Sequence, residues 1–243
     1  MTEKKPVDRT NEEKVASAEL LKAQADKAKA EARKIKAEAL KAEYEASGSR
    51  LTKEKLQRDR NKELAADAHH QLYRFIGGVT SEAVKTAMTE LTAWSRLNPK
   101  SPIEIVFSSP GGGVIDGFIL FDFIRELSKE GHKVTTGMLG IAASMGGILM
   151  QAGDQRWAGQ ESWYMIHRAA FGASGKTFDI EDEVEWVKRI EKRIIDLFVR
   201  RSNLSASKIK RNWDRKDWWI DADQALEFGL IDKIRGMQPK NKT

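Results

Sequence analysis

Ser144, His167 and a glycine-rich turn could together hydrolyse an acyl bond. Ser144 lies shortly after Gly140, at the start of an Ala/Met/Leu-rich segment that is expected to be helical. A hydroxyl at such a bend projects from a helix N-terminus, where free N–H groups and the helix dipole stabilise a developing oxyanion. His167 ends the apolar segment 164–166 and could serve as general base. These residue types within one domain-sized window are typical of a serine hydrolase.

The turn Ser-Pro-Gly-Gly-Gly at 109–113 follows an apolar, β-type segment. Gly112 lets a substrate carbonyl approach its backbone N–H closely because it has no side chain. Together with the N–H of Met145, it forms the candidate oxyanion hole. Each feature also has an ordinary interpretation: Ser144 as a helix cap, His167 as a structural histidine, and the turn as a tight strand–helix connection.

From Gln71 onward, strands and helices alternate and could position these residues. Strands are expected at 72–76, 103–107 and 133–138, and helices at 81–95, with Thr80 as its N-cap, and at 114–130. The alternation predicts an α/β fold of right-handed βαβ units around a mainly parallel sheet. Such sheets place functional loops at the carboxyl ends of their strands. We expect helix 114–130 to pack six apolar residues inward: Phe118, Ile119, Phe121, Phe123, Ile124 and Leu127.

These motifs resemble those of the proteolytic subunit of the Clp protease, within the crotonase-like superfamily. That family has a Ser-Pro-Gly-Gly turn, then Gly-x-Ala-Ala-Ser-Met-Gly, then Met-Ile-His, and later an acidic residue before an Ala-x-x-Ala-x-x-x-Gly-Leu-Ile-Asp ending. This chain has all four in the same order, and the ending spans 222–232. The resemblance extends from Gln71 to Gly236, and the residues before it have no counterpart in the family's short N-terminus.

The resemblance implies Ser144 as nucleophile, His167 as base, and Gly112 and Met145 as oxyanion hole. It also implies Asp217 as the third triad member, because this residue lies five positions before Ala222. Two neighbouring acids, Asp214 and Asp221, are competitors for that role, and Asp217 could instead be a surface acid beside Arg215 or Lys216. The family usually continues after the histidine with Gln-Pro, where this chain has Arg168-Ala169.

A long amphipathic helix is expected over 179–202. It is either a core helix or, as the family resemblance suggests, a handle helix that inserts between two stacked rings of subunits. The segment 172–175 would then be the handle turn. The resemblance further implies a homo-oligomer of stacked heptameric rings, a polypeptide substrate and an AAA+ unfoldase partner. No P-loop motif for ATP is present. The apolar stripe of the helix contains six residues: Val184, Val187, Ile190, Ile194, Leu197 and Phe198.

Residues 1–66 differ from the rest and are rich in Ala, Lys, Glu and Arg. Strong helix formers predict a helix over 11–46, a break at Ser47-Gly48-Ser49 and a second helix over 51–66. Large apolar residues are sparse there and do not form a sustained heptad seam. We expect a charged helical arm that is either solvated or packed on a partner, a protease domain over 67–236 and a disordered tail over 237–243.

Composition limits the class of protein. The 243 residues include no cysteine, which excludes disulfides, thiol catalysis and zinc–thiolate sites. The sequence contains no run of about 18 apolar residues that could span a membrane. The charged N-terminus lacks the apolar h-region of a secretory signal, so a cytoplasmic location is expected. The net charge of +6 is spread over many charges of both signs, which disfavours a nucleic-acid partner. No metal or cofactor is expected.

The prediction is therefore a serine endopeptidase that works through an acyl-enzyme. One alternative is a catalytically idle ring or scaffold subunit. Another is a Clp-like phage head-maturation protease that works without an ATPase, with the arm directing it to a capsid or scaffold protein. A crotonase-like acyl-CoA enzyme shares the fold but does not need Ser, His and Asp in this order. Ser–Lys chemistry is disfavoured by the placement of His167.

Overall fold

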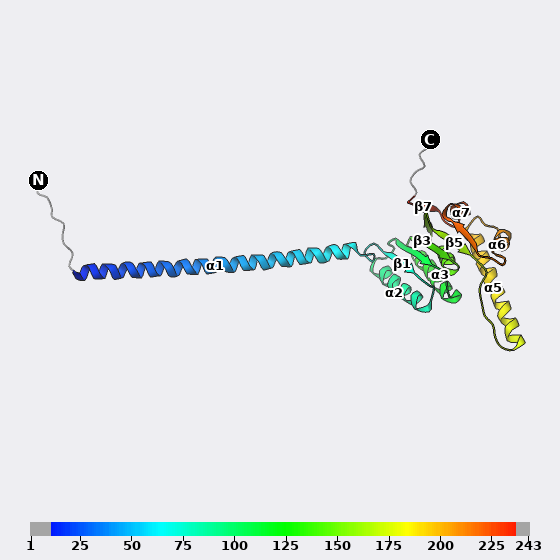
Figure 1. The fold of residues 1–243 in the computed structure, drawn as a ribbon, viewed down its shortest axis with the longest axis horizontal. Helices are drawn as coiled ribbons and strands as arrows, with labels where there is room; N and C mark the ends of the chain where they lie inside the picture. Colours follow the sequence, from blue (N-terminus) through cyan, green and yellow to red (C-terminus); the bar gives the residue numbers. More distant parts are fainter. Residues whose placement is uncertain (1–10, 237–243) are drawn as a thin grey trace, which may run out of the picture. The chain divides into compact units, whose positions relative to one another are not determined.

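A computed structural model describes residues 11–236 and divides the chain after Leu64 into two compact units. The described part of the first unit is helix α1, Asn11–Ala65, whose last residue already belongs to the second unit (Figure 1). The second unit contains the sheet and the remaining helices. The tail expected to be disordered, 237–243, and the first ten residues of the arm lie outside the described residues.

Helix α1 runs without interruption through 47–49, so the predicted break there is wrong. Glycine costs a helix about 1 kcal/mol but neither removes a backbone donor nor clashes, as proline would. Local contacts also support the helix at this point. The Thr52 hydroxyl donates to the Gly48 carbonyl at 3.0 Å, and Arg50 pairs with Glu54 at 3.1 Å. Strong helix formers on both sides therefore carry the helix across the glycine.

The second unit follows the predicted alternation, and its elements are close to those expected. The N-cap role of Thr80 is confirmed, because its hydroxyl accepts from Ala83 N–H at 3.2 Å. The elements are β1 Leu72–Ile76, α2 Ser81–Leu97, β2 Ile103–Ser109, α3 Val114–Lys129, β3 Val134–Ala143, α4 Met145–Met150, β4 Gln155–Gly159, β5 Trp163–Ile166, α5 Thr177–Arg201, α6 Ala206–Trp213, β6 Trp218–Asp221, α7 Ala222–Glu227 and β7 Lys233–Arg235.

The sheet is mainly parallel, as predicted, with the order β1-β2-β3-β4-β7. Strand β3 is its branch point. Residues 135–138 of β3 pair with β4, whereas residues 141–143 pair with β5. Strand β5 also pairs with β6, and this is the antiparallel pair of the described sheet. The carboxyl end of β3 is therefore held between β2 and β5, directly before Ser144.

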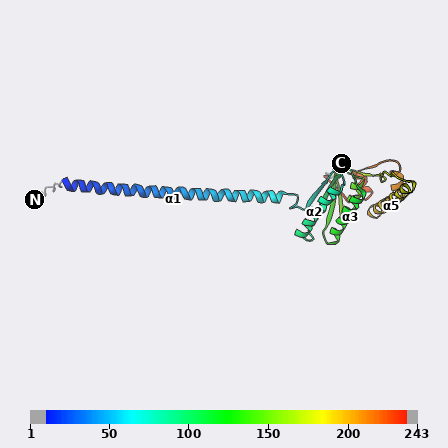
Figure 2. The same ribbon diagram turned by 90° about the horizontal axis from the view of Figure 1, so that it is seen from below.

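Helices α2 and α3 lie side by side next to the sheet, and α5 extends away from it (Figures 1 and 2). The core expected under α3 is confirmed for Ile124 and Leu127, which are buried, and Phe118, Phe121 and Phe123 pack against it partly buried. Ile119 was wrongly placed in the core, because it is about half exposed. Its position on the outer flank of the helix follows from the 3.6-residue period.

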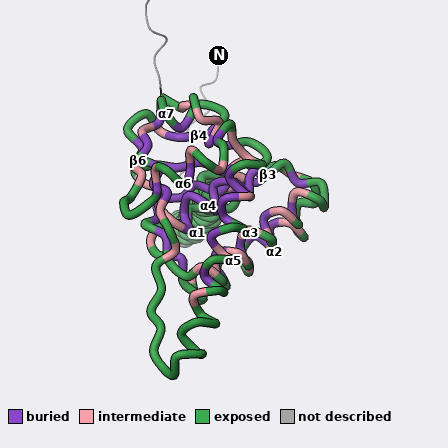
Figure 3. The backbone as a smooth tube through the Cα atoms, turned by 90° about the vertical axis from the view of Figure 1, so that its right-hand side faces the viewer, coloured by how far each residue is buried: buried purple, intermediate pink, exposed green. Residues whose placement is uncertain are grey.

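Buried residues gather around β3, β4, α4 and α6, whereas the segment before α5 and the first turns of α5 are exposed (Figure 3). The apolar stripe of α5 accordingly divides along its length. Val187, Ile194 and Phe198 are buried, while Val184, nearer the exposed end, is intermediate. Within residues 11–236, no helix is both long and apolar enough to cross a membrane.

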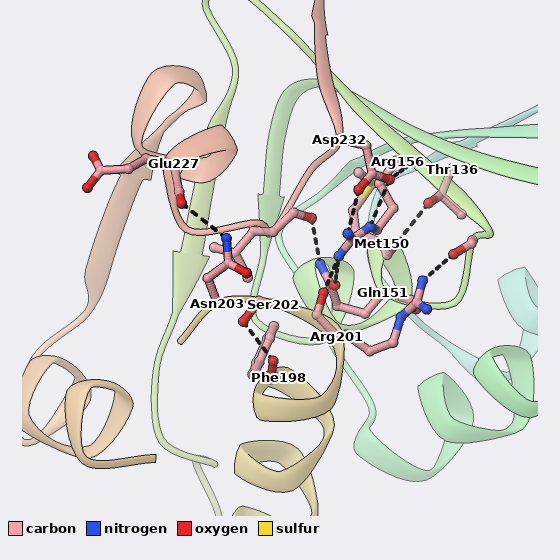
Figure 4. Close-up of polar contacts among 12 residues, drawn as sticks. Thr136, Met150, Gln151, Arg156, Phe198, Arg201, Ser202, Asn203, Glu227 and Asp232 are labelled. Atoms are coloured by element: carbon pink, nitrogen blue, oxygen red, sulfur yellow. Dashed lines mark hydrogen bonds and ion pairs between the residues drawn. The ribbon is translucent and has the colours of Figure 1, made fainter. Parts of the chain in front are cut away.

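A polar network anchors the C-terminal end of α4, the helix that begins after Ser144 (Figure 4). Arg156 donates to the Gln151 side-chain oxygen at 2.6 Å and pairs with Asp232 at 2.6 Å. Arg201, the last residue of α5, donates from Nε to the Gln151 carbonyl at 3.0 Å. Arg156 and Gln151 are buried, so these hydrogen bonds satisfy groups that would otherwise be costly to bury. The network joins the far end of α4 to β4, α5 and the C-terminal segment.

Candidate active site

Ser144 stands at the junction of β3 and α4 in a strained backbone conformation. Its φ is 55° and its ψ is −122°, a combination that residues with a side chain seldom adopt. Its N–H donates to the Met165 carbonyl of β5 at 2.9 Å, and its carbonyl accepts from Ile148 N–H in the first turn of α4. A sharp strand-to-helix turn of this kind exposes the hydroxyl at the end of the sheet. Helix α4 therefore begins at Met145, directly after Ser144.

The structure brings the three predicted side chains into one row. The Ser144 Oγ lies 2.7 Å from His167 Nε2, within hydrogen-bond distance. On the other side of the ring, His167 Nδ1 lies 3.4 Å from Asp217 Oδ1. The second separation is longer than a typical hydrogen bond, as catalytic contacts often are in free enzymes. A base that contacts a hydroxyl through one nitrogen and a carboxylate through the other can remove the hydroxyl proton.

The two competitors of Asp217 have other roles in the structure. Asp221 caps helix α7, where its carboxylate accepts from Gln224 N–H at 2.8 Å. Asp214 ends α6 and lies 3.9 Å from the Arg168 guanidinium. The pairing of β5 with β6 places Ile166 opposite Trp218, which explains why Asp217, one residue earlier, reaches His167, one residue later.

The glycine turn packs directly against Ser144 and leaves no room for side chains. A Cβ on Gly111 would lie 2.6 Å from the Ser144 Cβ, and one on Gly112 would lie 2.3 Å from the Val79 carbonyl oxygen. Both glycines also have positive φ, 99° and 151°. The hydrogen bonds that hold the turn use the N–H groups of Val79 and Gly113 rather than that of Gly112. The N–H of Met145, at the first position of α4, has no acceptor within its helix.

A cavity of about 280 Å³ opens beside Ser144 and His167. Apolar side chains from α3, α4, β5 and α5 form most of its wall, and the α5 contribution explains why part of that helix is apolar where it meets the site. The lining residues are Pro110, Gly112, Val114, Ser144, Met145, Ile148, Ile166, His167, Ala169, Ala170, Ile194 and Phe198.

One ion pair beside the site was missed by the sequence reasoning. Arg168 donates from Nε and Nη2 to the two carboxylate oxygens of Glu191, each at 2.9 Å. These hydrogen bonds, together with the carboxylate charge, raise the pKa of Arg168 above its ordinary value. A signal was present in the sequence, because Glu191 lies at helical spacing from Val187 and Ile194, on the apolar stripe of α5. A charge on a buried face indicates a partner of opposite charge.

Comparison with known proteins matches residues 53–238 to the Clp protease family. A relative in Chlamydia abortus, the ATP-dependent Clp protease proteolytic subunit 1, is 35% identical over 160 residues, which are 64% of this chain and 81% of the relative. The ATP-dependent Clp protease proteolytic subunit of Deinococcus radiodurans is 30% identical over 171 residues, 69% of this chain and 82% of the relative.

The matched segment contains the whole sheet, the glycine turn and the residues of the candidate site. Most of helix α1, from Asn11 to Thr52, lies before it. The four motifs of the sequence and the mainly parallel sheet agree with this match. The chain therefore belongs to the Clp protease family, whose members are serine-type peptidases.

Proposed function

We propose that this peptidase is an endopeptidase in which Ser144 is the nucleophile, His167 the general base and Asp217 the residue that orients the imidazole. The observation that carries the proposal is the 2.7 Å contact between Ser144 Oγ and His167 Nε2 at the mouth of an apolar cavity. The hydroxyl and the base are already close enough for direct proton transfer.

The reaction follows from these positions. Ser144 Oγ attacks the scissile carbonyl carbon while His167 Nε2 takes its proton, and the N–H groups of Gly112 and Met145 donate to the oxyanion that forms. The tetrahedral intermediate then collapses, and His167 gives the proton to the leaving amine. Water then attacks the acyl-enzyme while His167 takes its proton. The second tetrahedral intermediate collapses, the acid product leaves, and His167 returns the proton to Ser144 Oγ. Asp217 stabilises the imidazolium and keeps the proton of the neutral ring on Nδ1.

The cavity favours a substrate residue with an apolar side chain at the cleaved bond. Its wall is built mainly by residues such as Val114, Ile148, Ile194 and Phe198. The lining residues include no Asp, Glu, Lys or Arg, so a charged side chain would lose its hydration there without gaining a permanently charged partner. We expect peptides with leucine or methionine before the cleaved bond to react faster than those with aspartate or lysine.

We propose that the subunits assemble into rings, with heptamers stacked in pairs and α5 as the handle between them. Members of this family normally form oligomeric rings that pair with ATPase partners. In this chain, Phe178 and Trp186 on α5 are 76% and 48% exposed, which is apolar surface that a second subunit could cover. Mass photometry at micromolar concentration tests the ring, and a clean monomer that cleaves peptides contradicts it.

A second candidate concerns how substrates arrive. The name of the Chlamydia abortus relative describes an ATP-dependent protease. By analogy, we propose an AAA+ unfoldase as the partner of this chain. Helix α1 favours an alternative, because residues 18–65 are exposed and most of the helix lies before the family match. In that alternative, α1 directs the protease to a capsid or scaffold protein without an ATPase, as in phage head maturation. Digestion of a folded substrate with and without an added unfoldase and ATP separates the two.

The catalytic proposal is tested by the Ser144→Ala variant on a fluorogenic peptide. Loss of at least about 10³-fold in turnover is expected, because a triad acts as a unit. Ser207→Ala is the matched control, since Ser207 is an exposed serine on α6. Near-normal cleavage by Ser144→Ala would contradict the assignment, and a wild-type protein that forms rings but does not cleave would support an idle subunit instead.

A further inference from the structure

Three elements of the second unit meet at the guanidinium of Arg168, the residue directly after His167. Its Nε and Nη2 donate to Glu191 of α5, and its Nη1 lies 3.9 Å from the carboxylate of Asp214 at the end of α6. The loop that begins at Asp214 leads to Asp217. One side chain thus connects the strand end that carries the base, the helix that lines the cavity and the loop that carries the acid.

Of the two contacts, the one with Glu191 is the stronger, because it has two hydrogen bonds of 2.9 Å to a buried carboxylate. Glu191 is only 9% exposed, so its carboxylate depends on Arg168 for a charged partner. A planar guanidinium that donates two parallel hydrogen bonds fixes the direction of approach as well as the distance. The backbone beside His167 is therefore tied to the middle of α5 in a defined orientation.

Arg168 does not contribute to the substrate cavity. Its neighbours His167, Ala169 and Ala170 line that cavity, whereas Arg168 lines a separate hollow with Glu191 and Asp214. A side chain on the far side of the strand end is not placed to bind substrate. Its effect on the reaction must act through the groups that it holds.

The loop between Asp214 and Asp217 needs to be held at both ends. Arg215 within it has a φ of 57°, a left-handed conformation that residues other than glycine seldom adopt. At one end, the pairing of Ile166 with Trp218 fixes the start of β6. At the other end, Asp214 faces Arg168. The 3.4 Å approach of Asp217 to His167 lies between these two contacts in the chain.

We propose that Arg168 is a positioning residue, which keeps His167 and Asp217 in register by binding Glu191 on one side and Asp214 on the other. The inference rests on the proposed triad. It predicts that removing Arg168 lowers the turnover number and leaves substrate binding nearly unchanged, because a small displacement of a catalytic group costs rate without removing a substrate contact.

The test compares Arg168→Gln with the double variant Arg168→Gln/Glu191→Gln. The single variant leaves Glu191 buried without its partner, so it also loses stability. The double variant removes both charges, so that neither is left buried without a partner of opposite charge. Lys192→Gln is the control, because Lys192 is the next residue on α5 and pairs with Asp196 on the exposed face. For each protein, kcat and KM on a fluorogenic peptide are measured per active site, titrated with a fluorophosphonate, beside the melting temperature.

In the double variant we expect a melting temperature within a few degrees of wild type, a fall in kcat of about 10-fold and a change in KM of less than about twofold. Lys192→Gln should match wild type. A double variant with wild-type kcat would overturn the proposal, and so would a large rise in KM with unchanged kcat, which would indicate substrate contact. Failure of the triad itself is distinguishable, because the wild-type protein would then not be labelled at Ser144.

Discussion

Helix α1 and the second unit are built on opposite principles. The large apolar residues of α1, such as Leu20, Ile35 and Leu56, are more than half exposed, whereas Leu91, Phe107 and Leu149 of the second unit are fully buried. The helix is held by backbone hydrogen bonds and by pairs one turn apart, such as Arg50 with Glu54. The second unit is held by contacts between residues far apart in the sequence. Local amino-acid composition is enough to form helix α1, whereas the second unit forms only when residues far apart in the sequence pack together.

Glycine shows the same contrast at the level of one residue. A Cβ on Gly48 in α1 would meet no atom within 4 Å, whereas a Cβ on Gly112 would overlap the backbone of Val79. The first glycine is a local cost that the helix tolerates. The second is required by the close approach of two chain segments beside the candidate nucleophile. The four predictions that follow test this division, from the largest expected effect to the smallest.

The largest effect is expected for the other two triad positions. His167→Ala should lower peptide turnover by at least about 10³-fold, and Asp217→Asn should lower it by about 10²-fold or more, with the fold intact. Turnover of a fluorogenic peptide and circular dichroism measure the two quantities. Asp221→Asn is the matched control, because asparagine can also cap a helix. Asp214→Asn tests the other competitor and should lose less activity than Asp217→Asn, since Asp214 contacts Arg168 rather than His167. If either variant loses more activity than Asp217→Asn, the third member has been assigned to the wrong residue.

Gly112→Ala should destabilise the second unit by a few kcal/mol and abolish activity, because the added methyl group overlaps Val79 and the backbone must leave its positive φ. Gly48→Ala is its counterpart in α1 and should increase helix content slightly, by removing a cost of about 1 kcal/mol. Thermal melting and far-ultraviolet circular dichroism measure both. Equal effects of the two substitutions would contradict the contrast between the regions.

Acid should destabilise the second unit through the network around Arg156. Burial alone would raise the pKa of Asp232, but hydrogen bonding to Arg156 and its charge outweigh burial and lower this pKa below its ordinary value of 3.8. A lowered pKa means that the ionised carboxylate stabilises the fold above about pH 4 and that this stability is lost as the pH falls through the folded pKa. The melting temperature should therefore fall as the pH is lowered below about 4.

Asp232→Asn isolates this effect. It should melt lower than wild type at neutral pH and lose less on acidification, since the titrating group is gone. Asp26→Asn in α1 is the control, because Asp26 faces Lys29 at 4.0 Å with both side chains exposed. A parallel acid dependence for Asp232→Asn and wild type would show that the network does not titrate in this range.

The smallest effect on the second unit is expected from removing α1. Deletion of residues 1–64 ends before Asp67, whose carboxylate pairs with Arg74 of β1 at 2.7 Å. The shortened protein should melt within a few degrees of the full chain and cleave a small peptide at a similar rate, because the two parts form separate compact units. A shortened protein that fails to fold would show that α1 is part of the domain, and the boundary near residue 67 would be wrong.

The sequence allowed much of the fold and the site to be predicted because the relevant signals are local. Thr80 is followed by a helical pattern, Ile103–Phe107 is rich in β-branched and aromatic residues, and Ser144 lies between Ala143 and Met145-Gly146-Gly147. The order of the four motifs along the chain then indicated the family. Each of these features depends on a few neighbouring positions, which a sequence displays directly.

The remainder could not be predicted because it depends on distant pairings. The division of β3 between β4 and β5 is set by strand register, which no single segment encodes. The approach of Asp217 to His167 depends on the pairing of β5 with β6 and was expected only through the family resemblance. The link from Arg168 to Glu191 joins residues 23 positions apart. The uninterrupted α1 shows the opposite error, because a local break signal was outweighed by the helix formers around it.

The central claim is that Ser144 is the nucleophile, and covalent labelling tests it most directly. The wild-type protein is treated with a fluorophosphonate probe, digested and mapped by mass spectrometry, with Ser144→Ala and His167→Ala in parallel. We predict one adduct at Ser144, none in Ser144→Ala, and labelling at least about 10²-fold slower in His167→Ala, because the base is missing. An adduct on another serine, or undiminished labelling of Ser144→Ala, would contradict the account.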